Sequence, residues 1–169
     1  LLKAGVEFEI IPGVSSSYAA PAYAGIPVTH RDYASSFHVI TGHESADKTG
    51  LALDYATLAK EEGTLVFLMG LKNLPHIAEE LITHGKDPKT PAAVVQAGTT
   101  ARQQVVTGVL ESIAETAKTA GIQTPAITVV GDVVTLQRQL SWLGGKPLFG
   151  KRVLLTGTKP MCEKQREVL

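Results

Sequence analysis

The turns that follow the predicted strands carry the residues best suited to hold a ligand. Ser15 and Ser16 come shortly after Pro12-Gly13, where a strand pattern changes to a helix pattern. A helix that begins there leaves backbone N–H groups unpaired, and such groups can hold a polar or anionic ligand. Hydroxyl residues at this position also serve as ordinary helix caps. Both roles therefore stay open for the two serines.

Three further turns join this candidate set. Met69 ends a predicted central strand, and its flexible, polarizable side chain could lie against a bound ligand. A methionine at a strand end also commonly fills a core. Ala97-Gly98 ends another strand, and the missing Cβ of glycine lets the backbone approach a ligand closely. Thr124-Pro125-Ala126 leads into the last strand and offers main-chain groups.

Common arrangements of metal-ligating or nucleophilic residues are missing from the sequence. The five histidines have no histidine partner at an i, i+4 spacing, and no serine sits in a nucleophile elbow. We therefore predict no metal site. A G-x-G-x-x-G loop after a predicted strand is also absent, which argues against a Rossmann-type site. The sequence does not identify a catalytic base.

Composition limits the possible partners. The 169 residues carry 16 basic and 16 acidic side chains, so no overall field attracts nucleic acid or an anionic membrane. The single cysteine, Cys162, excludes an internal disulfide and suits a reducing, cytoplasmic compartment. Apolar runs such as 65–69 are too short to cross a bilayer. We expect neither a nucleic-acid partner nor a membrane span.

Strand and helix patterns alternate along the chain, which is typical of an α/β fold. Apolar runs and alternations bounded by glycine and proline predict strands over 6–11, 37–40, 64–69, 92–96, 103–107 and 126–130. Apolar residues at helical spacing predict helices over 15–24, 51–62, 74–84 and 109–120, with a helical or mixed segment over 133–142. We expect a three-layer sandwich around a mixed sheet of about five strands.

Several motifs keep their order and spacing over residues 1–143. They are PGVSS, AYAGIPVTHRDY, TGH, TLVFLMGL, LITHGKDPKTPAAVVQAGTTARQ and TPAITVVGDVV. Together they resemble the C-terminal half of the tetrapyrrole (corrin/porphyrin) methylase family, and within it the uroporphyrinogen-III C-methyltransferases.

This resemblance implies a methyl donor, S-adenosyl-L-methionine, which leaves as S-adenosyl-L-homocysteine. It places Ser15, Ser16, Met69-Gly70, Ala97-Gly98 and Thr124-Pro125-Ala126 at the donor. The implied reaction is C-methylation of uroporphyrinogen III to precorrin-2, in siroheme and cobalamin biosynthesis. A donor with its own reactive group needs a protein only to bind it, orient it and exclude water.

The implied tetrapyrrole substrate is rich in carboxylates, which a protein without net charge must meet with individually placed cations. Arginine can hold a carboxylate through two parallel hydrogen bonds. The candidate substrate-binding residues are His30, Arg31, His43 and Arg102. The alternative for each one is a solvated loop charge.

Similar proteins hold the donor between two domains, and an N-terminal glycine-rich segment and a GGDP-type loop complete the site. Neither motif occurs here. We expect residues 1–145 to be the C-terminal domain of such an enzyme, without its N-terminal domain, and to be a homodimer that binds the donor weakly and does not turn over. Residues 146–169 resemble a linker and the first strand, over 148–156, of a uroporphyrinogen-III synthase-like domain. Gly157 departs from that pattern, which usually has arginine there.

Two alternatives remain open. The chain would also suit another tetrapyrrole methylase, such as a later precorrin methyltransferase, although AYAGIPVTHRDY favours the first methylation step. The other alternative is a non-catalytic dimerisation module, because an isolated domain with exposed apolar surface tends to associate.

Overall fold

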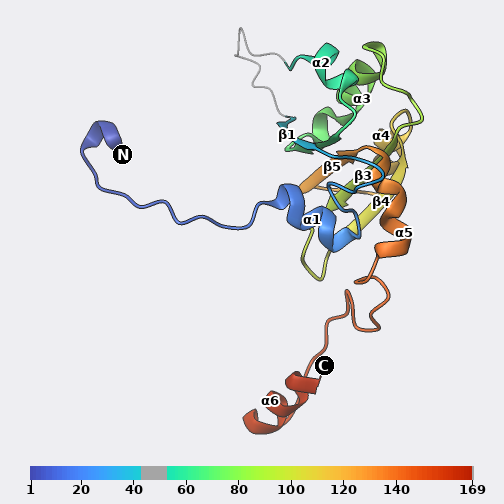
Figure 1. Ribbon diagram of the computed structural model, residues 1–169. Helices are drawn as coiled ribbons and strands as arrows, with labels where there is room; N and C mark the ends of the chain where they lie inside the picture. Colours follow the sequence, from blue (N-terminus) through green and yellow to red (C-terminus); the bar gives the residue numbers. More distant parts are fainter. Residues whose placement is uncertain (43–52, 169) are drawn as a thin grey trace.

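The computed structural model describes residues 1–42 and 53–168. Its centre is a five-stranded mixed sheet in the order β1-β2-β5-β3-β4, with helices on both faces (Figure 1). The strands are β1 (Phe37–Thr41), β2 (Thr64–Leu68), β3 (Pro91–Gln96), β4 (Gln104–Val109) and β5 (Ala126–Val130). The helices are η1 (Leu2–Ala4), α1 (Ser16–Ala24), α2 (Tyr55–Lys60), η2 (Leu71–Asn73), α3 (Leu74–Thr83), α4 (Ile113–Thr119), η3 (Asp132–Leu136), α5 (Gln137–Leu140) and α6 (Lys159–Val168).

Strand direction sorts the connecting loops into two groups. β1 and β2 are parallel, whereas β2–β5, β5–β3 and β3–β4 are antiparallel. β1, β2 and β3 therefore end at the same end of the sheet, where β4 and β5 begin. We call this the exit end. At the opposite end, β1, β2 and β3 begin and β4 and β5 finish.

The sheet separates two hydrophobic cores, which confirms the predicted three-layer sandwich. Successive side chains of a strand point to opposite faces. Leu65 and Phe67 of β2 pack with α3 and α4, whereas Val66 packs with α1 and η3. All three side chains are fully buried. A strand covered on both faces reads as a continuous apolar run, and residues 64–68 show that pattern.

The predicted serine cap of α1 is present. The Ser15 side chain accepts a hydrogen bond from the Ser17 backbone N–H at 3.3 Å, so it satisfies one of the free donors at the helix start. Gly25 ends the helix with a φ of 79°. A Cβ at Gly25 would lie 2.7 Å from the Leu140 carbonyl carbon, so glycine is needed there for space as well as for conformation.

The predicted strand over 6–11 does not form. Val6, Phe8, Ile10 and Ile11 are between 47% and 86% exposed, and the segment extends away from the sheet (Figure 1). Its alternating pattern is that of a half-buried strand, but a strand needs a neighbour to pair its backbone groups. No described strand runs beside this segment.

The predicted strand over 148–156 is also wrong. Turns occupy residues 144–150, no strand follows, and α6 then has no buried residue. Leu154 is 86% exposed, and the segment pairs with no strand of the described sheet. Smaller corrections concern helix starts. Val109 belongs to β4, so α4 begins at Ile113, and the described part of the predicted 51–62 helix is α2.

Candidate functional site

Loops that were predicted to hold the donor meet at the exit end of the sheet. Leu68 of β2 lies opposite Ile127 of β5, so Met69 follows β2 beside the start of β5. Across the next pair of strands, the Ala97 N–H donates to the Pro125 carbonyl oxygen at 2.9 Å. The Thr124–Pro125 bond is cis. The turns after β2 and β3 and the turn before β5 therefore form one surface.

Helix α1 brings the predicted serines to the same side of the fold. Gly98 packs directly on Ala20 of α1, where an added Cβ would collide with the Ala20 side chain and backbone. Ser15 and Ser16 are exposed at the start of this helix, about one turn before Ala20. The Ser15 and Ser17 hydroxyl oxygens lie 2.8 Å apart, and the Ser17 side chain is buried.

Unusual backbone conformations also gather at the exit end. Among the described residues, three that are not glycine have a positive φ: Met69 at 58°, Ala97 at 46° and Thr99 at 69°. Each such residue costs about 1–2 kcal/mol, and the conformation persists only where the surroundings enforce it. All three lie in the turns that follow β2 and β3. Local strain of this kind is concentrated at ligand-binding sites.

Met69 is also unusual in its exposure. It follows a strand whose first four residues are buried, yet 64% of its own surface is exposed. An apolar side chain in solvent on a left-handed backbone has no structural benefit in this domain. A ligand that covers the side chain would remove that surface from water.

Three amide side chains that sequence reasoning missed connect the loops of the exit end. Asn73 Nδ2 donates to the Gly42 carbonyl oxygen at 3.0 Å and so joins the turns after β1 and β2. Gln96 Oε1 accepts from the Gln123 N–H and joins the end of β3 to the turn before β5. Gln103 joins the β3–β4 turn to α1. Their only signal in the sequence is proximity to the predicted turns.

Glycine packing holds the β1 and β2 exits together. A Cβ at Gly42 would lie 2.6 Å from the Gly70 Cα, so these two backbones touch. Gly42 N donates to the Leu68 carbonyl oxygen at 2.7 Å, which extends the strand pairing by one residue. The close approach to Gly70 needs a residue without a side chain at Gly42.

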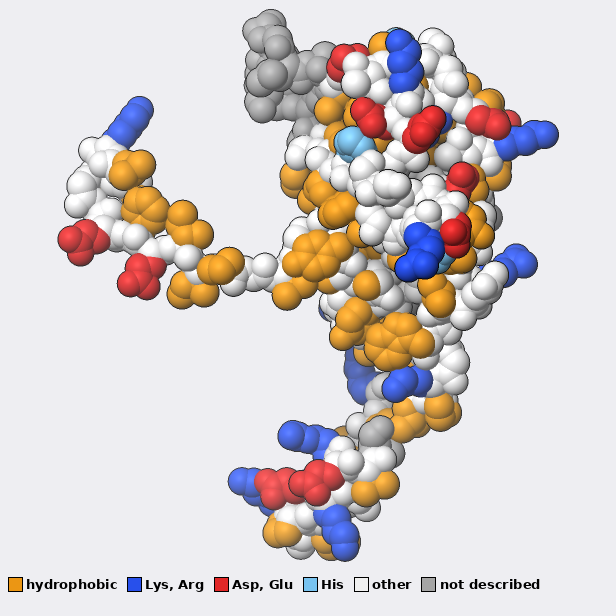
Figure 2. All heavy atoms as spheres, in the orientation of Figure 1, with side chains coloured by type: hydrophobic (Ala, Val, Ile, Leu, Met, Phe, Trp, Pro, Cys, Tyr) orange, Lys and Arg blue, Asp and Glu red, His pale blue; other side chains and the backbone are white. Residues whose placement is uncertain are grey.

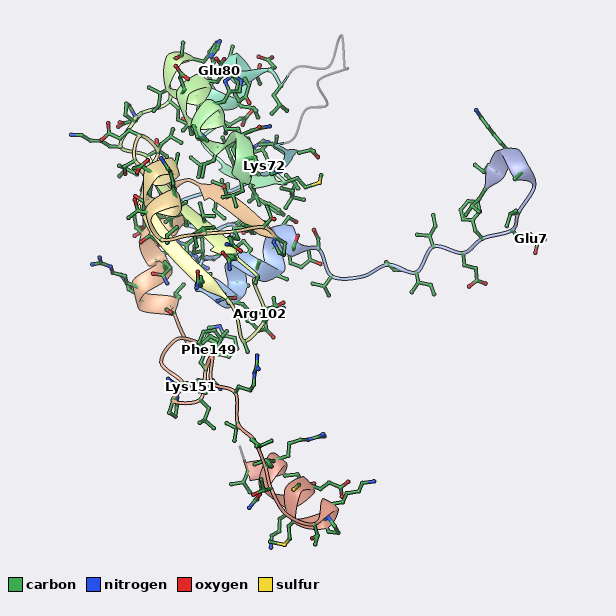
Figure 3. The ribbon with its side chains drawn as sticks, turned by 180° about the vertical axis from the view of Figure 1, so that it is seen from behind. Glu7, Lys72, Glu80, Arg102, Phe149 and Lys151 are labelled. Atoms are coloured by element: carbon green, nitrogen blue, oxygen red, sulfur yellow. The ribbon has the colours of Figure 1, made fainter. Side chains whose placement is uncertain are left out.

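Of the predicted substrate-binding cations, Arg102 lies at the exit end. It is exposed in the β3–β4 turn, and its N–H donates to Thr100 Oγ1 at 3.1 Å. Figure 3 shows Arg102 and Lys72, an exposed residue of η2, on the side of the domain from which the N-terminal segment extends. His43 lies outside the described residues.

His30 and Arg31 lie elsewhere. His30 and Ala34 exchange two backbone hydrogen bonds of 2.9 Å, which form a tight turn just before β1. The His30 ring packs on Tyr33 at 5.1 Å between centroids. Tyr33 lines a hollow at the opposite end of the sheet, between the start of β2 and the end of β5. The fold therefore does not bring this pair together with Arg102.

The hollow at the opposite end is lined by several charged side chains, and Lys86 has a structural role there. Lys86 Nζ donates to the carbonyl oxygens of Glu61 at 2.8 Å and Ala59 at 3.4 Å, which caps the C-terminus of α2. Burial lowers the pKa of Lys86, and the negative charge of Glu61 partly opposes that shift. The hollow contains none of the predicted donor-binding residues.

Two other kinds of site are absent from the described residues. There, no three His, Cys, Asp or Glu side chains come close enough to hold a metal ion. Residues 1–42 and 53–168 also contain no helix that is long and apolar enough to span a bilayer.

Comparison with known proteins agrees with the geometry. The model of the family Tetrapyrrole (Corrin/Porphyrin) Methylases matches residues 1–114. A uroporphyrinogen-III C-methyltransferase of Bacillus subtilis is 45% identical over 167 residues, which cover 96% of this chain and 34% of that protein. An S-adenosyl-L-methionine-dependent uroporphyrinogen III methyltransferase of Methanosarcina barkeri is 54% identical over 136 residues, covering 80% of this chain and 53% of the relative.

Solved structures give the same result. A uroporphyrin-III C-methyl transferase from Thermus thermophilus, complexed with S-adenyl homocysteine, superposes with a TM-score of 0.65 at 34% identity, over 80% of this chain and 57% of that chain. A cobalt precorrin-4 methyltransferase reaches 0.69 at 25% identity, over 79% and 55%. The chain thus spans about half, or less, of the relatives it matches. With a family model that matches most of its length and a mixed α/β sheet of the same fold, the chain belongs to the tetrapyrrole (corrin/porphyrin) methylase family.

Proposed function

We propose that this chain supplies the donor-binding half of an S-adenosyl-L-methionine-dependent methyltransferase that converts uroporphyrinogen III to precorrin-2. The observation that carries the proposal is the convergence of the Met69, Ala97-Gly98 and Thr124–Ala126 turns beside α1. The names of the Bacillus and Methanosarcina relatives support this reaction, which belongs to siroheme and cobalamin biosynthesis. A cytoplasmic location follows from that role.

The residues present fit an adenosyl group. Met69 offers an exposed thioether side chain, and Gly98 leaves the backbone of its turn without a Cβ in the way. Ser15 and Ser16 add hydroxyl groups at the start of α1. The donor supplies an activated methyl group when bound, so these residues need only hold it, orient it and exclude water.

We assign the carboxylate-rich substrate to the same end of the sheet. Arg102 is exposed there, and Lys72 adds a second cation on η2. Arg102 can hold a carboxylate through two hydrogen bonds, whereas Lys72 acts as a point charge. His43 stays in this proposal from its sequence position alone. His30 and Arg31 are left out of it, because their turn lies beside the opposite end.

Calorimetry with S-adenosylhomocysteine tests the donor site. We expect the full-length protein to bind it, and Met69→Ala to weaken binding about tenfold, because the substitution removes most of the apolar contact with the ligand. Binding by neither protein would refute the donor site and leave the non-catalytic dimerisation module as the better account.

A substrate assay separates the first methylation step from later ones, since the fold is also that of a cobalt precorrin-4 methyltransferase. Methyl transfer to uroporphyrinogen III, and none to later precorrins, is expected. The reverse preference would replace the proposed substrate and keep the donor site.

We also propose that residues 1–145 require an N-terminal domain. The unpaired 6–11 segment has the pattern of a strand that joins another sheet, and four of its apolar side chains are exposed. The isolated chain should therefore bind the donor weakly and show no turnover. Methyl transfer by the isolated chain at the rate of the full-length enzyme would contradict this.

Residues 146–169 are proposed to begin a second domain of the uroporphyrinogen-III synthase type. The match to the Bacillus relative covers 96% of this chain, so it includes part of the tail, and it uses only 34% of that protein. Val153 and Leu154 are exposed, as expected for an apolar segment that is not packed into a domain core. Uroporphyrinogen III formation by the full-length protein would support the fusion, and its absence would oppose it.

A homodimer is the last part of the proposal. Apolar side chains gather over α1 and the segment after α5 (Figure 2). Tyr23 and Trp142 pack edge to face there, with ring centroids 5.3 Å apart, and remain 39% and 49% exposed. Exposed apolar patches of this kind mark association surfaces. Light scattering on wild type and Trp142→Ala tests this, and a monomeric wild type would contradict it.

A further inference from the structure

We propose that Gln103 is a positioning residue that fixes the donor-binding turn against α1, an inference that rests on the proposed donor site. Its side chain is half-buried and uses both ends of its amide. Nε2 donates to the Tyr23 carbonyl oxygen of α1 at 3.1 Å, and Oε1 accepts from the Thr99 N–H at 2.9 Å. One amide group therefore joins the β3–β4 turn to a helix 80 residues away in sequence.

The turn needs this support because its backbone is strained. Ala97 and Thr99 both have positive φ, at 46° and 69°. The Ala97 carbonyl oxygen accepts from Thr100 Oγ1 at 2.7 Å, and the Gln103 N–H donates to the Thr100 carbonyl oxygen at 3.0 Å. Gln103 Oε1 is the partner of the Thr99 N–H. Loss of this acceptor would remove a contact that holds Thr99 in the left-handed region.

Two contacts along α1 set where the turn lies. Gly98 packs on Ala20, and the Gln103 amide reaches Tyr23, about one helical turn further on. Ser15 and Ser16 begin the same helix. Contact at these two points restrains the turn against α1, and with it the position of the Ala97-Gly98 backbone relative to the serine hydroxyls. Without Gln103 the turn loses its side-chain hydrogen bond to α1.

The chain offers a matched control for this role. Gln137 Nε2 donates to the Ala24 carbonyl oxygen at 3.3 Å, so it also anchors the C-terminal part of α1. It comes from α5 and does not touch the β3–β4 turn. Gln103→Met and Gln137→Met each remove one amide bond to α1 and keep a similar side-chain length. Gln103→Met also removes the acceptor of the Thr99 N–H, so its loss of thermal stability should be at least as large as that of Gln137→Met.

The test uses the full-length protein. Wild type, Gln103→Met and Gln137→Met are compared for the Kd of S-adenosylhomocysteine, for the KM values of donor and uroporphyrinogen III, and for amide hydrogen exchange across 97–103. Gln103→Met should raise the Kd and the donor KM about fivefold, the loss of roughly one hydrogen bond, and leave the KM of the tetrapyrrole unchanged. Gln103→Glu keeps an acceptor for the Thr99 N–H but loses the donor to the Tyr23 carbonyl, so exchange at Thr99 should be slower than in Gln103→Met.

The outcomes separate this inference from the proposed function. Equal effects of Gln103→Met and Gln137→Met on donor binding would overturn the positioning role and leave the donor site intact. Lack of binding by wild type would refute the donor site. In that case hydrogen exchange decides whether Gln103 still holds the turn: unchanged exchange at 97–103 in Gln103→Met contradicts the inference, and faster exchange supports it.

Discussion

The two ends of the sheet are built in different ways. At the exit end, backbone turns with positive φ meet, neutral amides connect them, and Met69 is left in solvent. At the opposite end, Lys86 caps α2, and His38 Nε2 lies 3.2 Å from a carboxylate oxygen of Glu61. These contacts give the residues of the opposite end a role in the stability of the fold. The backbone strain and the exposed Met69 side chain of the exit end are a pattern typical of ligand-binding sites.

The largest expected effect comes from Gly98→Ala. The new Cβ would collide with Ala20, so either the turn or α1 must move. We expect a loss of about 2–3 kcal/mol in the free energy of unfolding, as for other overpacked sites, and loss of donor binding. Gly145→Ala is the control, because no atom lies within 4 Å of its Cβ position. Denaturant unfolding and calorimetry measure both quantities, and a fully stable, donor-binding Gly98→Ala would break the contrast between the two ends.

Met69→Gly separates two effects at the exit end: the backbone strain at residue 69 and the contact of the Met69 side chain with the donor. Glycine accepts a φ of 58° without cost, so Met69→Gly should be about 1 kcal/mol more stable than Met69→Ala. Both variants should bind S-adenosylhomocysteine about tenfold more weakly than wild type. Chemical denaturation compares the stabilities. If the two variants were equally stable, the backbone at Met69 would not be strained.

Lys86→Met should affect the opposite end alone. The substitution leaves the Ala59 and Glu61 carbonyls without their donor and should cost about 1 kcal/mol, with donor binding unchanged. Lys118→Met, at an 80% exposed position, is the control. Because burial lowers the pKa of Lys86, the unfolded chain holds more protons between that lowered pKa and the ordinary 10.5. Wild-type stability relative to Lys86→Met should therefore rise with pH in that window. A fall in relative stability over this pH range would contradict a lowered pKa of Lys86.

The smallest effect is expected at the N-terminus of α2. Asp54 accepts from the Thr57 hydroxyl at 2.6 Å and from its N–H at 3.0 Å, and these bonds lower the pKa of the Asp54 carboxyl below its ordinary 3.8. The stabilisation is complete above pH 3.8 and is lost as the pH falls through the folded-state value. Asp54→Asn should lose this part of the acid sensitivity. An unchanged acid-unfolding midpoint would show that the cap makes no measurable contribution.

The sequence predicted the central strands well because their signal is local. Residues 64–68 are buried on both faces, so the apolar run alone was sufficient. The strand over 6–11 has an equally clear pattern, but strand pairing depends on a neighbour that local sequence does not specify. The sequence also predicted both His30 and Arg102 to lie in loops near strand ends.

Only the strand directions show that the two loops lie at different ends of the sheet.

Some features of the candidate site were also predictable from local sequence, and others depend on distant contacts. Turn chemistry pointed to Ala97-Gly98, since a glycine after a strand permits close approach. The role of Gln103 depends on a contact with Tyr23 across 80 residues, which no local pattern contains. Positive φ at Met69 could not be foreseen either, because methionine normally avoids that region.

Hydrogen–deuterium exchange of the full-length protein, with and without S-adenosylhomocysteine, tests the central claim most directly. Our account predicts that the ligand slows exchange in peptides that cover 69–73, 96–103 and 124–127, and leaves 59–63 and 84–88 unchanged. Protection confined to 59–63 and 84–88, or none at saturating ligand, would contradict it.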